Sequence, residues 1–117
     1  MDISKETSEK IQELQILEQH LQNFLAQKQS IQIELNEAIN AIEEINKTDE
    51  EVYKILSGVM IKTDKVSTIK DLEEKKKLLE LRISSIEKQE KTLEDKSMQL
   101  KNEVTSSIQD KKSESLA

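Results

Sequence analysis

The sequence predicts a mainly α-helical fold, a long antiparallel two-helix coiled coil with one β-hairpin between the helices. Two long segments carry apolar residues in alternating steps of three and four, the spacing of a narrow helical stripe that must meet another helix. A short middle segment is rich in β-branched residues instead. The composition, with 36% charged residues, 2% aromatic residues, no proline and one glycine, suits long helices better than a compact core.

The first helix is expected over about residues 7–46, with its start near residues 4–8. Thr7 or Ser8 is expected to cap it, and residues 46–49 to end it through side chains that compete for backbone hydrogen bonds. Only Lys28 interrupts its apolar stripe, or seam, which consists of Leu14, Leu17, Leu21, Phe24, Lys28, Ile31, Leu35, Ala38, Ile42 and Ile45.

The hairpin is expected over residues 52–63, as two strands on either side of Ser57-Gly58. Gly58 tolerates the positive φ that a tight hairpin turn requires. A plain loop between the helices is the alternative.

The second helix is expected over residues 69–110, capped by Ser67 or Thr68 and followed by a polar tail at 111–117. All 117 residues then form one domain. The seam of this helix has more polar members and consists of Leu72, Lys76, Leu79, Ile83, Ile86, Glu90, Leu93, Ser97, Leu100 and Val104.

The two seams predict how the helices align. In an antiparallel pair of helices, the residue numbers of two facing positions always add to the same sum. An alignment with a sum of 114 places no polar seam residue opposite another polar one. A shift by one heptad, to 121, also fits the pattern. With the sum of 114, Lys28 and Glu90 lie in adjacent layers, either as an ion pair that helps to fix the register or as two tolerated, solvated residues.

The apolar sequence of the expected hairpin predicts that the chain forms an oligomer. A lone two-stranded hairpin is marginal in water, and its open edges and apolar side chains invite strands of other copies. Helical arms would then project from a β-structure that several subunits share, unless the hairpin folds back on its own arms. The residues expected at this interface are Val52, Tyr53, Ile55, Leu56, Gly58, Val59, Met60 and Ile61.

The far ends of the arms are expected to loosen, because continuing the seam outward gives Thr7, Lys10 and Ser107. Apolar groups there would be partly exposed, as a binding tip or as the scattered apolar residues of any surface. Ile33 and Leu81, on outward positions nearer the hairpin, would be free to contact a neighbour.

No catalytic pattern is present, so we expect a protein that is not an enzyme and has no cofactor. His20, the only histidine, is read as a solvated residue, and there is no phosphate loop, nucleophile elbow or metal motif. The net charge of −6 argues against nucleic acid and anionic membranes. The polar N-terminus and the lack of long apolar runs predict a cytoplasmic protein.

The chain resembles archaeal-type beta subunits of the prefoldin family. The resemblance rests on Glu51-Val52-Tyr53-Lys54, Gly58 and Val59-Met60-Ile61-Lys62-Thr63, set between two heptad arms. Gln27-Lys28-Gln29, Leu81-Arg82-Ile83 and Ile86-Glu87-Lys88-Gln89-Glu90 also look like the family. A single hairpin matches the beta type, since alpha-type subunits carry two.

The resemblance implies an ATP-independent holdase chaperone, in which two alpha and four beta subunits form a hetero-hexamer. Their hairpins would assemble into an intersubunit β-barrel, and the arm tips would capture unfolded proteins and pass them to a group II chaperonin. The alternative is a structural coiled-coil scaffold or adaptor that binds one specific folded partner. The residues proposed at the tip, which no motif fixes, are Ile3, Ile11, Leu14, Val104 and Ile108.

Overall fold

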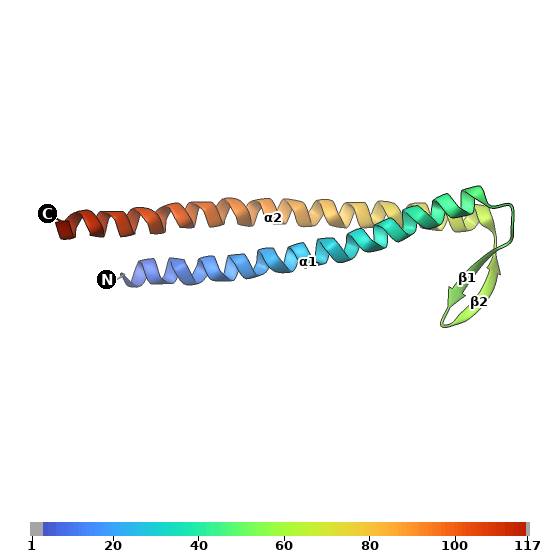
Figure 1. The fold of residues 1–117 in the computed structure, drawn as a ribbon, viewed down its shortest axis with the longest axis horizontal. Helices are drawn as coiled ribbons and strands as arrows, with labels where there is room; N and C mark the ends of the chain where they lie inside the picture. Colours follow the sequence, from blue (N-terminus) through green and yellow to red (C-terminus); the bar gives the residue numbers. More distant parts are fainter. Residues whose placement is uncertain (1–3, 117) are drawn as a thin grey trace. The chain divides into compact units, whose positions relative to one another are not determined.

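Two long helices and one β-hairpin make up the computed structural model, which describes residues 4–116, with side chains for residues 4–109. The chain runs through α1 (Lys5–Lys47), β1 (Val52–Leu56), β2 (Val59–Thr63) and α2 (Lys65–Leu116) (Figure 1). The predicted fold class, two long helices with one hairpin between them, is confirmed. The chain divides into two compact units, a terminal unit (residues 1–27 with 86–117) and a hairpin unit (residues 28–85).

The first helix begins at Lys5, within the range expected for its start, but its cap is a different residue. Ser4 is the N-cap, because its Oγ accepts a hydrogen bond from the amide of Thr7 at 3.1 Å. Thr7 lies three residues after Ser4, so the predicted cap Thr7 is instead a residue of the first turn, as is Ser8. The hydroxyl of Ser4 also donates to the Oγ1 of Thr7 at 2.8 Å.

The second helix begins earlier than predicted, at Lys65, and its cap is Asp64 rather than Ser67 or Thr68. The Oδ2 of Asp64 accepts from the amide of Ser67 at 3.0 Å, and the Asp64 carbonyl accepts from the hydroxyl of Thr68 at 2.7 Å. Asp64 follows β2 directly, so strand and helix are separated by the cap alone. At its other end α2 continues to Leu116, through most of the predicted tail.

Side-chain hydrogen bonds stabilise the junction between α1 and the hairpin, within the hairpin unit. Lys65 Nζ donates to the carbonyl oxygen of Thr48 at 2.9 Å, which satisfies a backbone acceptor just past the end of α1. The Oγ1 of Thr48 accepts from the amide of Glu50 at 3.1 Å. Strand β1 begins two residues later.

The predicted seam is the core of both units. None of the seam residues named from the sequence is exposed. The terminal unit buries Leu17, Ile86, Leu100 and Val104, and the hairpin unit buries Leu35, Ala38, Ile42 and Leu79. In the heptad notation abcdefg, Leu14 and Leu35 of α1 lie at position a, and Leu17 lies at position d. Lys76 and Ser97 are a positions of α2.

Ion pairs across the terminal unit fix its register. Glu13 and Lys96, both at g positions, pair at 3.1 Å, and Glu18 and Lys101, both at e positions, pair at 3.7 Å. Their residue numbers add to 109 and 119, which lie symmetrically about 114. A register of 121 would separate Glu13 from Lys96 by about 18 Å along the axis, at about 1.5 Å per residue. The alignment with the sum of 114 therefore holds here.

The hairpin has the predicted strands and turn. Val52 pairs with Thr63 and Leu56 with Val59, so the paired residue numbers add to 115. Ser57 (φ 51°) and Gly58 (φ 79°) both have positive φ, as a type I′ turn requires. Gly58 adopts this conformation without strain, whereas for Ser57 it is an uncommon one that the sequence analysis did not anticipate.

The register of the terminal unit can be tested by disulfide formation, because the chain contains no native cysteine. Leu17 and Ser97 face each other in the register of 114, so a Leu17→Cys/Ser97→Cys variant should oxidise readily to an intrachain disulfide. Leu17→Cys/Val104→Cys, which matches the register of 121, is the control and should stay reduced. Gel mobility with and without reductant gives the result, and a reversed preference would contradict the assignment.

Candidate interaction surfaces

The hairpin carries a dense group of exposed large apolar side chains. Ile55 is 70% exposed and Met60 66%. Every other predicted interface residue on the strands is also exposed except Val52, which is half-buried, and Gly58 lies in the exposed turn. The remaining exposed apolar members are Tyr53, Leu56, Val59 and Ile61. A group this dense on ten strand residues is typical of an interaction surface.

Both faces of the hairpin are apolar. Directly paired residues of an antiparallel sheet share a face. Ile55 and Met60 therefore lie on one face, and Leu56, Val59 and Ile61 on the other. A single covering layer would leave one of these faces in water, so the hairpin suits a setting in which both faces are covered.

The strand edges are open as well. The only sheet in the described part of the chain is this two-stranded one, so the outer edge of each strand has backbone groups without a strand partner. Each edge offers a template for a strand of another copy. The hairpin is thus suited to become part of a larger sheet.

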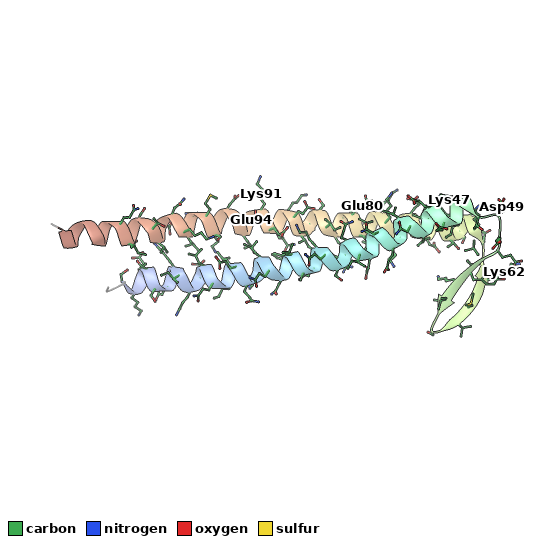
Figure 2. The ribbon with its side chains drawn as sticks, viewed as in Figure 1. Lys47, Asp49, Lys62, Glu80, Lys91 and Glu94 are labelled. Carbon is green, nitrogen blue, oxygen red and sulfur yellow. The ribbon has the colours of Figure 1, made fainter. Side chains whose placement is uncertain are left out.

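Polar side chains at the base of the hairpin form a small hydrogen-bonded cluster. Tyr53 donates its hydroxyl to Glu51 at 2.7 Å, and Lys62, which is labelled in Figure 2, pairs with the same carboxylate at 3.0 Å. The hydrogen bond from Tyr53, with the contact of Lys62, lowers the pKa of Glu51. The same bond raises the pKa of the Tyr53 phenol, since ionisation would break it.

At the chain ends, the terminal unit does not loosen where the sequence analysis expected it to. Thr7 is 4% exposed and Val104 9%. Lys10 is also only partly exposed, because its Nζ pairs with Glu103 across the coil at 3.3 Å and with Glu6 at 3.7 Å. Of the polar residues that were expected to open the seam, Thr7 is held by the Ser4 cap and Lys10 by this ion pair.

The predicted tip residues are therefore mostly covered in the isolated chain. Ile11, Leu14 and Ile108 are half-buried and Val104 is buried, while Ile3 lies outside the described residues. The structure brings these four described residues together in the terminal unit but does not expose them.

Other apolar residues of the terminal unit are more exposed, and the sequence analysis missed them. Ile16 is 56% exposed, Leu25 49% and Met98 66%. They lie outside the seam, so seam continuity gives no signal for them. Met98 lines a shallow groove of about 300 Å³ with Leu21 and Ser97, beside Glu94 and Lys101. The small side chain of Ser97 leaves this gap next to Leu21.

His20 has no visible catalytic setting. It is exposed and lines a second shallow groove with Phe24, Gln89, Thr92 and Leu93. Among the side chains that the structure describes, no three His, Asp or Glu residues are grouped to hold a metal ion. Within residues 4–116, neither helix has a stretch that is long and apolar enough to cross a membrane.

Comparison with protein families gives one match over most of the chain. The family model described as "Prefoldin subunit" matches residues 8–111. The prefoldin beta subunit of Thermococcus onnurineus is 38% identical over 98 residues, which cover 82% of this chain and 84% of the relative. That of Methanospirillum hungatei is 37% identical over 113 residues, covering 95% and 94%.

A solved structure has the same fold. The crystal structure of the prefoldin beta subunit from Thermococcus strain KS-1 superposes with a TM-score of 0.84 at 34% identity. The match covers 90% of this chain and 94% of the other. The resemblance inferred from the hairpin motif and the heptad arms is therefore confirmed.

The pKa shift of Glu51 predicts how the hairpin responds to pH. Because its pKa is lowered in the folded state, Glu51 stabilises the hairpin above its unfolded-state pKa, and this contribution disappears as the pH falls through the folded-state pKa. Tyr53→Phe should move the pKa back toward its ordinary value, as measured by carboxyl ¹³C NMR. Lys62→Met should act in the same direction, and Lys54→Met, on the other face, should not. An unchanged titration in Tyr53→Phe would contradict the assignment.

Proposed function

Since this chain belongs to the prefoldin family, we propose that it is a beta-type subunit of an ATP-independent holdase chaperone. In this role it joins alpha-type subunits, two alpha to four beta, and works in the cytoplasm. The assembly captures unfolded proteins and passes them to a group II chaperonin. The observation that carries the proposal is the hairpin, with two exposed apolar faces and two open edges.

The hairpin supports a shared hub for two physical reasons. The apolar side chains on one face would lose contact with water if the hairpins of several copies closed into a barrel, and packing of neighbouring subunits on the outside of the barrel would cover the other face. Closure would also pair the open edges. The interface residues in this proposal are the eight hairpin residues named from the sequence, Val52, Tyr53, Ile55, Leu56, Gly58, Val59, Met60 and Ile61.

Client capture is proposed to involve the chain ends in the terminal unit, where Ile11, Leu14, Val104 and Ile108 lie. Val104 is buried and the other three are half-buried, so they become fully available only when the two helix ends separate. The seam there contains Thr7 and Lys10, which contribute less apolar burial than leucine would. Opening the outer layers of Thr7 and Lys10 is therefore less costly than opening a layer of two leucines, and the layer of Leu14 and Leu100 would open last.

An aggregation assay tests the holdase proposal. A chemically unfolded client is diluted without ATP into this chain, alone and with an alpha-type partner, while light scattering reports aggregation and the mass of the assembly. We expect suppression by a hexamer-sized species. Ile55→Glu/Met60→Glu should dissociate the assembly and abolish suppression, because the charges would have to be buried in the hub. Leu25→Glu, at an exposed helix position of the terminal unit, is the control and should leave the assembly intact.

Two results would contradict this proposal. A chain that stays monomeric or dimeric and does not suppress aggregation, even with the partner, would favour a scaffold that binds one folded protein. An assembly that survives Ile55→Glu/Met60→Glu would show that the hairpin is not the hub. Circular dichroism of each variant would verify that the helices remain folded.

Capture by separated helix ends has its own test. Thr7 and Ser107 face each other in the register of 114, so Thr7→Cys/Ser107→Cys can lock the ends with a disulfide. Neither residue is among the proposed tip residues. The oxidised variant should lose most of its suppression of aggregation, and reduction should restore it. The Leu17→Cys/Ser97→Cys lock, farther from the ends, should have a smaller effect. Full capture by the oxidised Thr7→Cys/Ser107→Cys variant would instead point to exposed groups such as Ile16 and Met98.

A further inference from the structure

One side of the coil in the hairpin unit has opposite charges on its two helices. This side, called here the g face, is formed by c and g positions. On α1 it carries Glu34, Glu37 and Glu44, all exposed, with no basic residue among its c and g positions in the unit. On α2 it carries the exposed Lys75 and Arg82 on either side of Leu78, which is 57% exposed. The opposite side lacks this pattern, because its e positions on α1 are Gln32, Ile39 and Asn46.

The acidic and basic side chains described on the g face are not paired with each other within the chain. Glu34 and Lys75 occupy the same relative positions as Glu13 and Lys96, which pair at 3.1 Å in the terminal unit. Among the side chains that the structure describes, however, Glu34 and Glu37 are not paired with Lys75 or Arg82, in contrast to the cross-helix pair of Glu13 and Lys96. The acidic row of α1 and the basic row of α2 therefore remain open to another molecule.

The axial positions of these charges make the g face complementary to itself. The uninterrupted heptads carry the sum of 114 into the hairpin unit, where this sum places Leu35 opposite Leu79, and both are buried. At this sum, Glu37 is level with position 77 and Glu34 with position 80. Both glutamates thus fall between the levels of Lys75 and Arg82, each about 3 Å from the nearer one at about 1.5 Å per residue.

A two-fold axis parallel to the helices would bring the rows together. Rotation by half a turn places α1 of one copy opposite α2 of the other and keeps every residue at its axial level. Glu37 would then meet Lys75 of the second copy, and Glu34 would meet Arg82. Such an interface is isologous, because each copy gives and receives the same contacts. Leu78 would lie between the two ion pairs.

We propose that the g face of the hairpin unit is an arm-to-arm contact that joins two copies of this chain side by side, with their helices parallel. The inference rests on the proposed function, since a shared hub would hold neighbouring copies in this orientation and raise their effective concentration. An exposed ion pair contributes little alone. Because the shared hub would already hold the two copies together, these ion pairs are sufficient to keep the arms in contact. The contact sets the direction and spacing of neighbouring arms where they leave the hub.

One residue pair opposes the contact. Glu44 is level with position 70, so in the same arrangement it lies beside Asp71 of the second copy. Like charges this close are unfavourable, and they would push the coils apart near the hairpin. Removing the charge of Asp71 should therefore strengthen the contact, an effect that a purely disruptive variant could not produce.

Disulfide trapping between different chains tests the contact, because the native chain has no cysteine. A Glu37→Cys chain is co-assembled with a Lys75→Cys chain and oxidised, and mixed disulfides are quantified by mass spectrometry. The control replaces Lys75→Cys by Lys77→Cys, an exposed lysine at the level of Glu37 but on a b position, away from the g face. We expect about tenfold more mixed disulfide with Lys75→Cys, and equal yields in an assembled sample would overturn the proposal.

Charge reversal separates attraction from mere proximity. Glu34→Lys in the Glu37→Cys chain, or Arg82→Glu in the Lys75→Cys chain, should each lower the yield about tenfold, and the two together should restore it. Asp71→Asn in both chains should raise the yield, and added salt should lower it. Assembly without these responses refutes the contact and leaves the hub intact, whereas a chain that never assembles refutes both.

Discussion

The rest of the structure depends on one constraint, the constant register of a narrow apolar seam. Each helix is too polar to be stable alone over this length, so its stability comes from the facing stripe. The seam tolerates the buried Ser97, which is 4% exposed, because its neighbouring layers are apolar. It tolerates Thr7, which is also 4% exposed, because the Thr7 hydroxyl accepts a hydrogen bond from Ser4 at 2.8 Å. Once the sum of 114 is set, the positions of the flanking charges follow without further adjustment.

A seam that is satisfied within the chain leaves the hairpin without a partner. The buried apolar stripe of the hairpin unit includes Leu35, Ala38, Ile42 and Leu79. On the strands, by contrast, Ile55 and Met60 are more than half exposed. The chain therefore separates two tasks that a globular domain combines. Its helices are stabilised by internal pairing, while its strands retain unsatisfied apolar surface for other molecules.

Periodicity predicted the parts of the structure that repeat, and single residues decided the parts that it missed. The heptads gave every seam position, and the Ser57-Gly58 turn gave the strand register. The helix caps were missed because Ser4 and Asp64 compete with Thr7 and Ser67, which are chemically similar capping residues three positions away. Which of them caps depends on where the preceding segment stops, and periodicity does not report that.

The interaction surfaces were predictable to different degrees for the same reason. The hairpin surface follows from composition, since five-residue strands with apolar residues on both faces cannot be covered by a single coil. The chain ends depend on particular contacts, such as that of Lys10 with Glu103 at 3.3 Å, which cover residues that periodicity left open. The end of the seam is thus covered but only weakly apolar. In the proposed function, capture of a client there would compete with pairing of the helices, so only chains that offer enough apolar surface would hold the ends apart. Folded proteins, which hide that surface, would be passed over without any further device for recognition.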